Sequence, residues 1–252
     1  MSRVKLVLGD DSVAAKHLLA RHLIIHDQHR RAPSYVDPGS MQFPTKSLLQ
    51  CSRLLAEAIV RSEEERDPAV RVGRLVIIGF DDPQSPPRFG TMLANLVAHH
   101  LELRQGVEPG RVHVRRVPER RERAESPRWL WQREFFNGTT LQGARMYFVT
   151  DVPRAEGLLK HVVKTAVGNE YQGVPYDPRK DVERGKALVG GIGCLALWED
   201  EEIQERELAK HLGFVPTILA FAPGFVRSSS WRSALSTGDF HAMHAPDCQS
   251  SE

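Results

Sequence analysis

The sequence predicts an α/β protein in which helices flank an open, mostly parallel sheet, and three observations lead to this prediction. Apolar runs of strand length alternate with amphipathic runs of helix length between residues 141 and 223. Acidic residues closely follow two of the apolar runs, at Asp151 and at Glu199, as they do at the ligand-binding edge of such sheets. The chain of 252 residues, 41% of them hydrophobic, is long enough to bury one sizeable core.

The first half of the chain predicts helices before the first strand of the sheet. The spacing of apolar residues indicates helices, and a short continuous apolar run indicates a buried strand. The charged run 61–67 is expected to be the solvated end of the second helix. In chain order we expect a helix over 12–25, a helix that opens at Pro44, a strand over 74–79, a proline-rich loop over 80–88 and a helix over 89–103.

The second half repeats the alternation of strand and helix, interrupted by polar segments. A run of mixed charge over 115–127 predicts a mobile loop, and 168–184 is a second polar insertion. The end of the chain, 238–252, lacks periodicity and is expected to be disordered. The ordered elements are expected as a strand over 111–114, a strand over 146–149, an amphipathic segment over 156–163, a strand over 186–198, a helix over 203–213 and a strand over 216–223.

Charge and cysteine content narrow the class of protein. The 34 basic and 32 acidic residues give a net charge of +2, which argues against nucleic acid or an acidic membrane as the partner. Three scattered cysteines, Cys51, Cys194 and Cys248, fit a reducing compartment better than a disulfide framework. No apolar run approaches the roughly 18 residues of a membrane helix. A cytoplasmic protein without membrane contact is therefore expected.

Four segments occur in a characteristic order and spacing. They are Pro-Ser-Tyr-Val-Asp at 33–37, the apolar strand 75–79 with its loop, Val-Arg-Arg at 114–116 before a charged loop, and the run 138–152 that ends in Thr-Asp-Val. Together they resemble the type I phosphoribosyltransferases, and most closely the orotate phosphoribosyltransferases, over residues 33–223.

This resemblance implies a phosphoribosyltransferase-like fold with an N-terminal hood over 1–70, an α/β core over 71–225 and an irregular or disordered tail over 226–252. It also implies Mg²⁺-dependent transfer between phosphoribosyl diphosphate and a nitrogenous base in nucleotide metabolism. Orotate, a pyrimidine, is the nearest family substrate. The family commonly forms homodimers, so a homodimer is expected.

The resemblance implies a role for each site residue. Asp151 would orient the ribose, the backbone of 152–157 would hold the 5′-phosphate, and Arg115, Arg116 or Arg120 would neutralise pyrophosphate. Asp81 and Asp82 lie in the expected pyrophosphate loop, where they would either hold Mg²⁺ or cap a turn. The substrate-binding set is thus Thr150, Asp151, Val152, Pro153, Arg154, Ala155, Glu156 and Gly157, with Asp81 and Asp82.

Departures from the family pattern lead to a second hypothesis. Thr150 stands where the family has an acid, and Glu156 would bring negative charge to a phosphate, although a slip of one residue would place Gly157 at the family's glycine. The catalytic lysine of the mobile loop has no equivalent, because no lysine occurs between Lys46 and Lys160. The alternative is therefore a catalytically degenerate member, a pseudoenzyme, that binds a nucleotide or serves as a structural or regulatory subunit.

Three other motifs are interpreted without a separate function. Gly-Gly-Ile-Gly at 190–193 lies inside a strand instead of before a helix, so close packing explains it better than dinucleotide binding. The arginines of 115–127 with the aromatics of 129–136 could bind nucleic acid, but interspersed acids dilute their charge, and we expect the aromatics in core or subunit contacts. His241, His244 and Cys248 lack an obvious fourth ligand, so no zinc site is expected.

Overall fold

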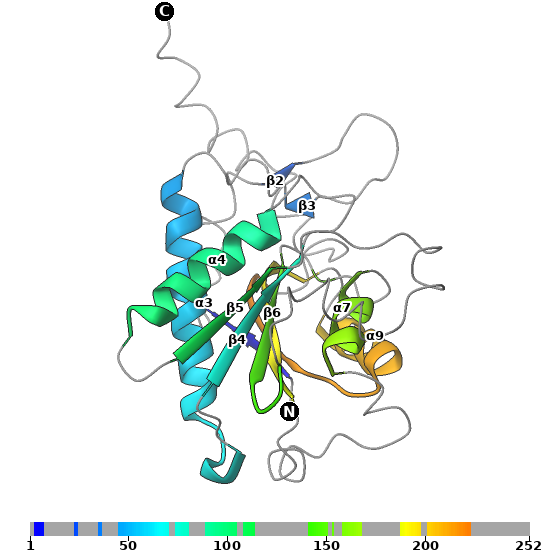
Figure 1. Cartoon of the computed structure of the whole chain (residues 1–252). Helices are drawn as coiled ribbons and strands as arrows, with labels where there is room; N and C mark the ends of the chain where they lie inside the picture. Colours follow the sequence, from blue (N-terminus) through cyan, green and yellow to red (C-terminus); the bar gives the residue numbers. More distant parts are fainter. Residues whose placement is uncertain are drawn as a thin grey trace, which may run out of the picture.

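The computed structural model describes the main part of the predicted α/β core. The described residues are 3–7, 23–24, 35–36, 45–70, 74–80, 89–104, 108–113, 141–150, 153, 158–167, 187–197 and 201–222. Six parallel strands form one sheet in the order β1-β8-β7-β6-β4-β5 (Figure 1). Their bounds are β1 Val4–Leu6, β4 Arg74–Gly79, β5 Glu108–His113, β6 Arg145–Val149, β7 Leu188–Ala196 and β8 Thr217–Ala222.

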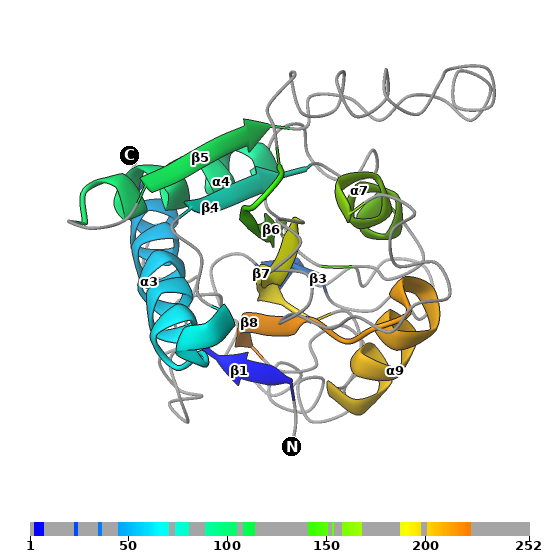
Figure 2. The same ribbon diagram turned by 60° about the horizontal axis from the view of Figure 1, so that its bottom comes forward.

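Helices cover both faces of this sheet. On one face lie α3, Thr45–Glu64, and α4, Phe89–Glu102; on the other lie α7, Leu158–Val167, and α9, Glu201–Leu212 (Figure 2). A 3₁₀ turn, Pro68–Val70, follows α3. Two short strands, β2 Leu23–Ile24 and β3 Tyr35–Val36, form a separate antiparallel pair. The open, parallel, helix-flanked sheet that the sequence predicts is thereby confirmed.

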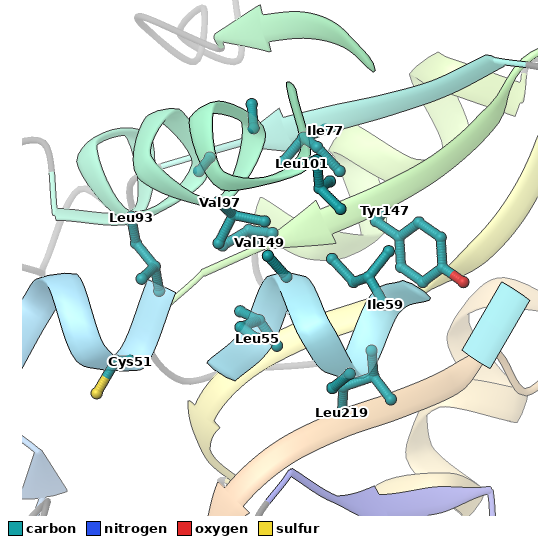
Figure 3. Close-up of a cluster of buried hydrophobic side chains, with 14 of the residues drawn as sticks. Cys51, Leu55, Ile59, Ile77, Leu93, Val97, Leu101, Tyr147, Val149 and Leu219 are labelled. Atoms are coloured by element: carbon teal, nitrogen blue, oxygen red, sulfur yellow. The ribbon is translucent and has the colours of Figure 1, made fainter. Parts of the chain in front are cut away.

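The strands carry apolar side chains on both faces, as a doubly covered parallel sheet requires. In β4, Leu75 and Ile77 belong to the core beneath α3 and α4, and Val76 and Ile78 belong to the core beneath α7 and α9. Figure 3 shows the first of these cores, where the α3 side chains of Leu55 and Ile59 lie over the sheet next to residues of α4, β4, β6 and β8.

Two of the three cysteines lie inside these cores. Cys51 and Cys194 are both buried, and burial raises the pKa of the Cys51 thiol to about 12. At neutral pH Cys51 therefore remains a protonated, unreactive thiol. None of the described helices is long and apolar enough to cross a membrane.

The structure corrects the amino-terminal part of the prediction. Val4–Leu6 forms an edge strand that pairs with β8, although three residues are too few to show a periodic pattern. Leu23 and Ile24, at the end of the predicted helix 12–25, lie in strand β2. Val7, the residue after β1, lies in the same hydrophobic core as Leu48 and Leu55 of α3. The boundaries at residues 70 and 225 stay predictions. The segments 115–127, 168–184 and 226–252 lie outside the described residues.

The predicted solvated helix end 61–67 is only partly solvated. Glu63 and Arg66 turn toward the sheet, where the Glu63 carboxylate accepts a hydrogen bond from Tyr147 Oη at 2.6 Å and one from Arg66 Nε at 2.7 Å. Arg145 Nε lies 2.9 Å from the other Glu63 oxygen, and the Arg145 side chain is fully buried. These four residues form a charged network at the amino-terminal edge of the sheet, which holds the end of α3 against β6.

A β-bulge in β7 completes this network. Met146 pairs with Val189 and Tyr147 with Gly191, so Gly190 is an extra residue in the ladder. Its carbonyl accepts a hydrogen bond from Arg66 Nη2 at 2.7 Å. A Cβ at Gly190 would lie 2.5 Å from the Tyr147 ring. The glycines of β7 therefore serve close packing, which agrees with the interpretation of the Gly-Gly-Ile-Gly motif.

The network predicts a loss of stability at alkaline pH. Burial, reinforced by the nearby Glu63 carboxylate, raises the pKa of Tyr147 from 10.0 to about 12. Because the folded-state pKa lies above the unfolded one, this contribution is present below about pH 10 and is lost as the pH rises toward 12. Between these limits we expect the wild type to lose roughly 2–3 kcal/mol of stability from this group. Urea unfolding of wild type and Tyr147→Phe at about pH 9 and pH 11.5 measures it. Equal losses in both proteins would contradict the assignment.

Candidate functional site

The strand order creates a single switch point in the core of the sheet. From β4 the chain passes to β5 on one side, and it then returns to β6 on the other side of β4. Counted from β4, the order of the last five strands is 2-1-3-4-5, and ligands of such sheets bind where neighbouring connections leave in opposite directions. This point lies beyond Gly79 of β4 and Val149 of β6, which are paired in register.

At the end of β4, small residues bring a helix close to the strand. A Cβ at Gly79 would lie 2.5 Å from the Cβ of Ala94 and 3.0 Å from the carbonyl oxygen of Gly90. The first turn of α4 can therefore lie directly against the strand end.

At the end of β6, the chain continues in contact with its neighbours. The Thr150 backbone N–H donates to the carbonyl of Gly193 at 3.1 Å, so pairing with β7 extends one residue beyond the strand. Thr150 is only 1% exposed. Pro153 is also buried, and its carbonyl accepts a hydrogen bond from Gln204 Nε2 of α9 at 3.2 Å.

The next helix begins a short distance beyond these contacts. α7 starts at Leu158, so its amino end follows the end of β6 by one short connection. The first N–H groups of a helix have no carbonyl partner within the helix and favour anions. The connection 150–157 thus leads from the switch point to an end of a helix that is suited to a phosphate group.

The structure describes two of the predicted site residues, Thr150 and Pro153, and both lie in this connection. Chain order brings the remaining ones to connections that leave the same edge of the sheet, after β4, β5 and β6. Their roles stay predictions, because these residues lie outside the described part of the chain: Asp81, Asp82, Arg115, Arg116, Arg120, Asp151, Val152, Arg154, Ala155, Glu156 and Gly157.

Gln204 is a residue of this region that sequence reasoning missed. The sequence did contain an indication of its burial: Gln204 precedes Leu208 and Leu212 at intervals of four residues, so the three side chains lie on the same face of the helix. Within the described residues, no group of three histidine, cysteine or acidic side chains could hold a metal. Asp81 and Asp82, the residues proposed to bind Mg²⁺, lie outside the described residues. Their carboxylate oxygens are of the ligand type that this ion prefers.

The sheet order defines an open α/β fold with helices on both faces and a switch point between β4 and β6. No model of a protein family and no curated protein matches the sequence. Among solved structures, the chain is similar to an adenine phosphoribosyltransferase from Leishmania donovani, with 15% identity, a TM-score of 0.48, and coverage of 88% of this chain and 84% of that one.

Two orotate phosphoribosyltransferases are also similar to the chain. The protein from Mycobacterium tuberculosis has 13% identity and a TM-score of 0.41, with 85% of this chain and 88% of that chain covered. The protein from Aeropyrum pernix has 16% identity and a TM-score of 0.40, with 83% and 90% covered.

Proposed function

We propose that this protein binds phosphoribosyl diphosphate at the carboxyl-terminal edge of β4 and β6 and transfers its phosphoribosyl group to a nitrogenous base. The observation that supports this proposal best is topological. The connections that contain Asp151, the acids 81–82 and the arginines 115–120 all leave the edge of the sheet at or beside the switch point. Orotate is the base that the sequence resemblance favours.

In this proposal each connection handles one part of the substrate. Asp151 accepts hydrogen bonds from the ribose hydroxyls, and the backbone of 152–157 together with the amino end of α7 holds the 5′-phosphate. Arg115, Arg116 or Arg120 binds the pyrophosphate oxygens, for which the forked guanidinium is well suited. Asp81 and Asp82 would hold Mg²⁺, which when bound supplies charge neutralisation for the diphosphate.

The transfer breaks one bond and forms another at the same ribose carbon. The bond from C1′ to the diphosphate oxygen breaks, and its electron pair leaves with pyrophosphate. A ring nitrogen of the base forms the new bond to C1′, and the proton of that nitrogen is released to water. Positive charge on the arginines stabilises the departing pyrophosphate, and one such preorganised group contributes about 10²–10³ in rate.

A second candidate function is a non-catalytic phosphoribosyl-binding or regulatory subunit. Thr150, the neutral residue at the position of the family's first acid, is 1% exposed, and its backbone N–H is held by β7. A carboxylate at such a buried position would cost desolvation free energy. This observation favours a site that has lost part of its ribose recognition. For both candidate functions we propose that the protein forms a homodimer and is located in the cytoplasm.

Titration calorimetry of phosphoribosyl diphosphate with Mg²⁺ tests the shared binding step. We expect a dissociation constant in the micromolar range for the wild type and binding about 10- to 150-fold weaker for Asp151→Ala, since a hydrogen bond to a charged group contributes about 1.5–3 kcal/mol. Glu64→Ala is the matched control, because Glu64 is an exposed acid at the opposite edge of the sheet. Absence of binding to the wild type would refute the transferase and a phosphoribosyl-binding subunit, and a structural or regulatory subunit with a protein partner would be the remaining candidate.

Release of pyrophosphate then separates the two candidates. Turnover with orotate, uracil or a purine, abolished by Asp151→Ala, supports the transferase. Tight binding without turnover of any of these bases supports the non-catalytic subunit.

A further inference from the structure

Gln204 is a polar residue whose side chain is buried among apolar residues of the core. It is 1% exposed, and it shares one face of α9 with Leu208 and Leu212, which are 0% and 6% exposed. A buried amide costs free energy unless hydrogen bonds replace its contacts with water, whereas leucine at this position would add to the core and propagate the helix well. The amide therefore needs a specific partner.

That partner is the connection between β6 and α7. Gln204 Nε2 donates to the carbonyl oxygen of Pro153 at 3.2 Å, and both residues are buried. A proline has no backbone N–H, so the carbonyl is the hydrogen-bonding group that Pro153 offers. The contact joins two elements that are 51 residues apart in the chain.

The start of the connection is held at two points by two different elements. The ladder contact of the Thr150 N–H with Gly193 fixes it to β7, and the Gln204 contact fixes Pro153 to α9. Together with the start of α7 at Leu158, these contacts hold the described residues Thr150 and Pro153 of the connection in place. Restricting a binding segment before the ligand arrives lowers the entropy lost on binding.

We propose that Gln204 is a positioning residue for the segment that receives the 5′-phosphate, an inference that rests on the proposed function. Gln204 acts through the backbone of Pro153. Gln204 should therefore increase the affinity for ligands that carry the 5′-phosphate. The affinity for pyrophosphate, which is proposed to bind at the connections after β4 and β5, should not depend on Gln204.

Two ligands and two variants test this specificity. In Gln204→Leu we expect the dissociation constant of ribose 5-phosphate to rise about three- to tenfold, the effect of losing one buried hydrogen bond, and that of pyrophosphate to stay unchanged. The matched control is Leu208→Ala, one turn further along the same buried face. It should lower the melting temperature without changing the ratio of the two constants.

A pH-dependent rescue adds a signature that general loss of packing does not produce. In Gln204→Glu, a protonated carboxyl group can donate to the Pro153 carbonyl, but an ionised one cannot, and burial favours the protonated form. Relative to wild type at the same pH, ribose 5-phosphate should bind this variant nearly normally at about pH 5.5 and more weakly at about pH 8.

Each outcome decides for or against the inference. Equal weakening of both ligands in Gln204→Leu, or the same selective loss in Leu208→Ala, would overturn it. If the wild type binds neither ligand, the proposed function fails, and amide hydrogen exchange without ligand decides the positioning role separately. Faster exchange over residues 150–158 in Gln204→Leu but not in Leu208→Ala supports the role, and unchanged exchange in Gln204→Leu refutes it.

Discussion

Replacing Glu63 with glutamine is expected to lower the free energy of unfolding by about 3 kcal/mol. The substitution keeps the shape of the side chain but removes the charge that Arg66 and Arg145 share. Removing one partner from a buried ion pair typically costs 3–5 kcal/mol, and Glu63 belongs at the low end because 15% of its side chain is exposed. The Tyr147 hydroxyl would also lose its charged acceptor.

Urea unfolding at neutral pH measures this effect, and the same helix supplies the control. Glu57 pairs with Arg53 one turn away at 2.8 Å, but the Arg53 side chain is 54% exposed. Pairs of this kind contribute about 0.3–0.5 kcal/mol, so Glu57→Gln should be nearly neutral. Similar losses for the two variants would show that the network at the sheet edge has no special energetic weight.

Gly191→Ala is expected to destabilise the protein by about 2–3 kcal/mol through overpacking. A Cβ at this position would lie 2.6 Å from the carbonyl oxygen of Thr217 and 3.2 Å from the ring of Tyr147. Thr217 belongs to β8, which pairs with β7 at this residue, so its backbone cannot turn aside without disturbing the ladder. The substitution thus forces two neighbouring strands apart.

A second glycine of the same strand provides the comparison. A Cβ at Gly193 would meet Leu55 side-chain atoms at 3.0–3.3 Å, and a leucine side chain can shift more easily than a backbone. Gly193→Ala should therefore cost clearly less than Gly191→Ala when both are compared by thermal and urea unfolding. The opposite ranking would mean that the fit of α3 on the sheet, and not strand pairing, limits the residue size in β7.

These two predictions concern the amino-terminal edge of the sheet, whereas the proposed ligand site lies at the other edge. Glu63, Arg66, Arg145 and Tyr147 join α3 to β6 at the first edge, and Thr150, Pro153 and Gln204 hold the connection of β6 at the second. Strand β6 therefore links the two regions. Substitutions at the first edge are therefore expected to change stability, and substitutions at the second edge are expected to change ligand binding.

The sequence alone predicted most of the sheet because its elements have strong local patterns. Continuous apolar runs predicted β4, β6, β7 and β8, and a periodic spacing of leucines predicted α3. The carboxyl-terminal edge as a candidate site followed from the acid near the end of the run 146–149. Such patterns are visible within a single segment, which is why they need no knowledge of a partner.

The features that the sequence did not reveal depend on residues far away in the chain. β1 is a strand because β8 lies beside it, and its three residues carry no pattern of their own. From the sequence alone, Glu63 and Arg66 are interpreted as solvated charges. Their partial burial is evident only from the packing of this part of the chain against β6 and β7. Gln204 acquires a role only through the carbonyl of Pro153, 51 residues earlier.

By itself, then, the sequence determined the α/β class, the main strands and helices and the resemblance to phosphoribosyltransferases, because local periodicity and segment order encode them. The tertiary structure decided the strand order, the switch point between β4 and β6, the buried charge network and the contact that holds Pro153. Each of these features depends on desolvation and hydrogen bonding between segments that are far apart in the chain and come into contact only in the folded protein. The residue pattern within one segment does not show which other segments it will contact.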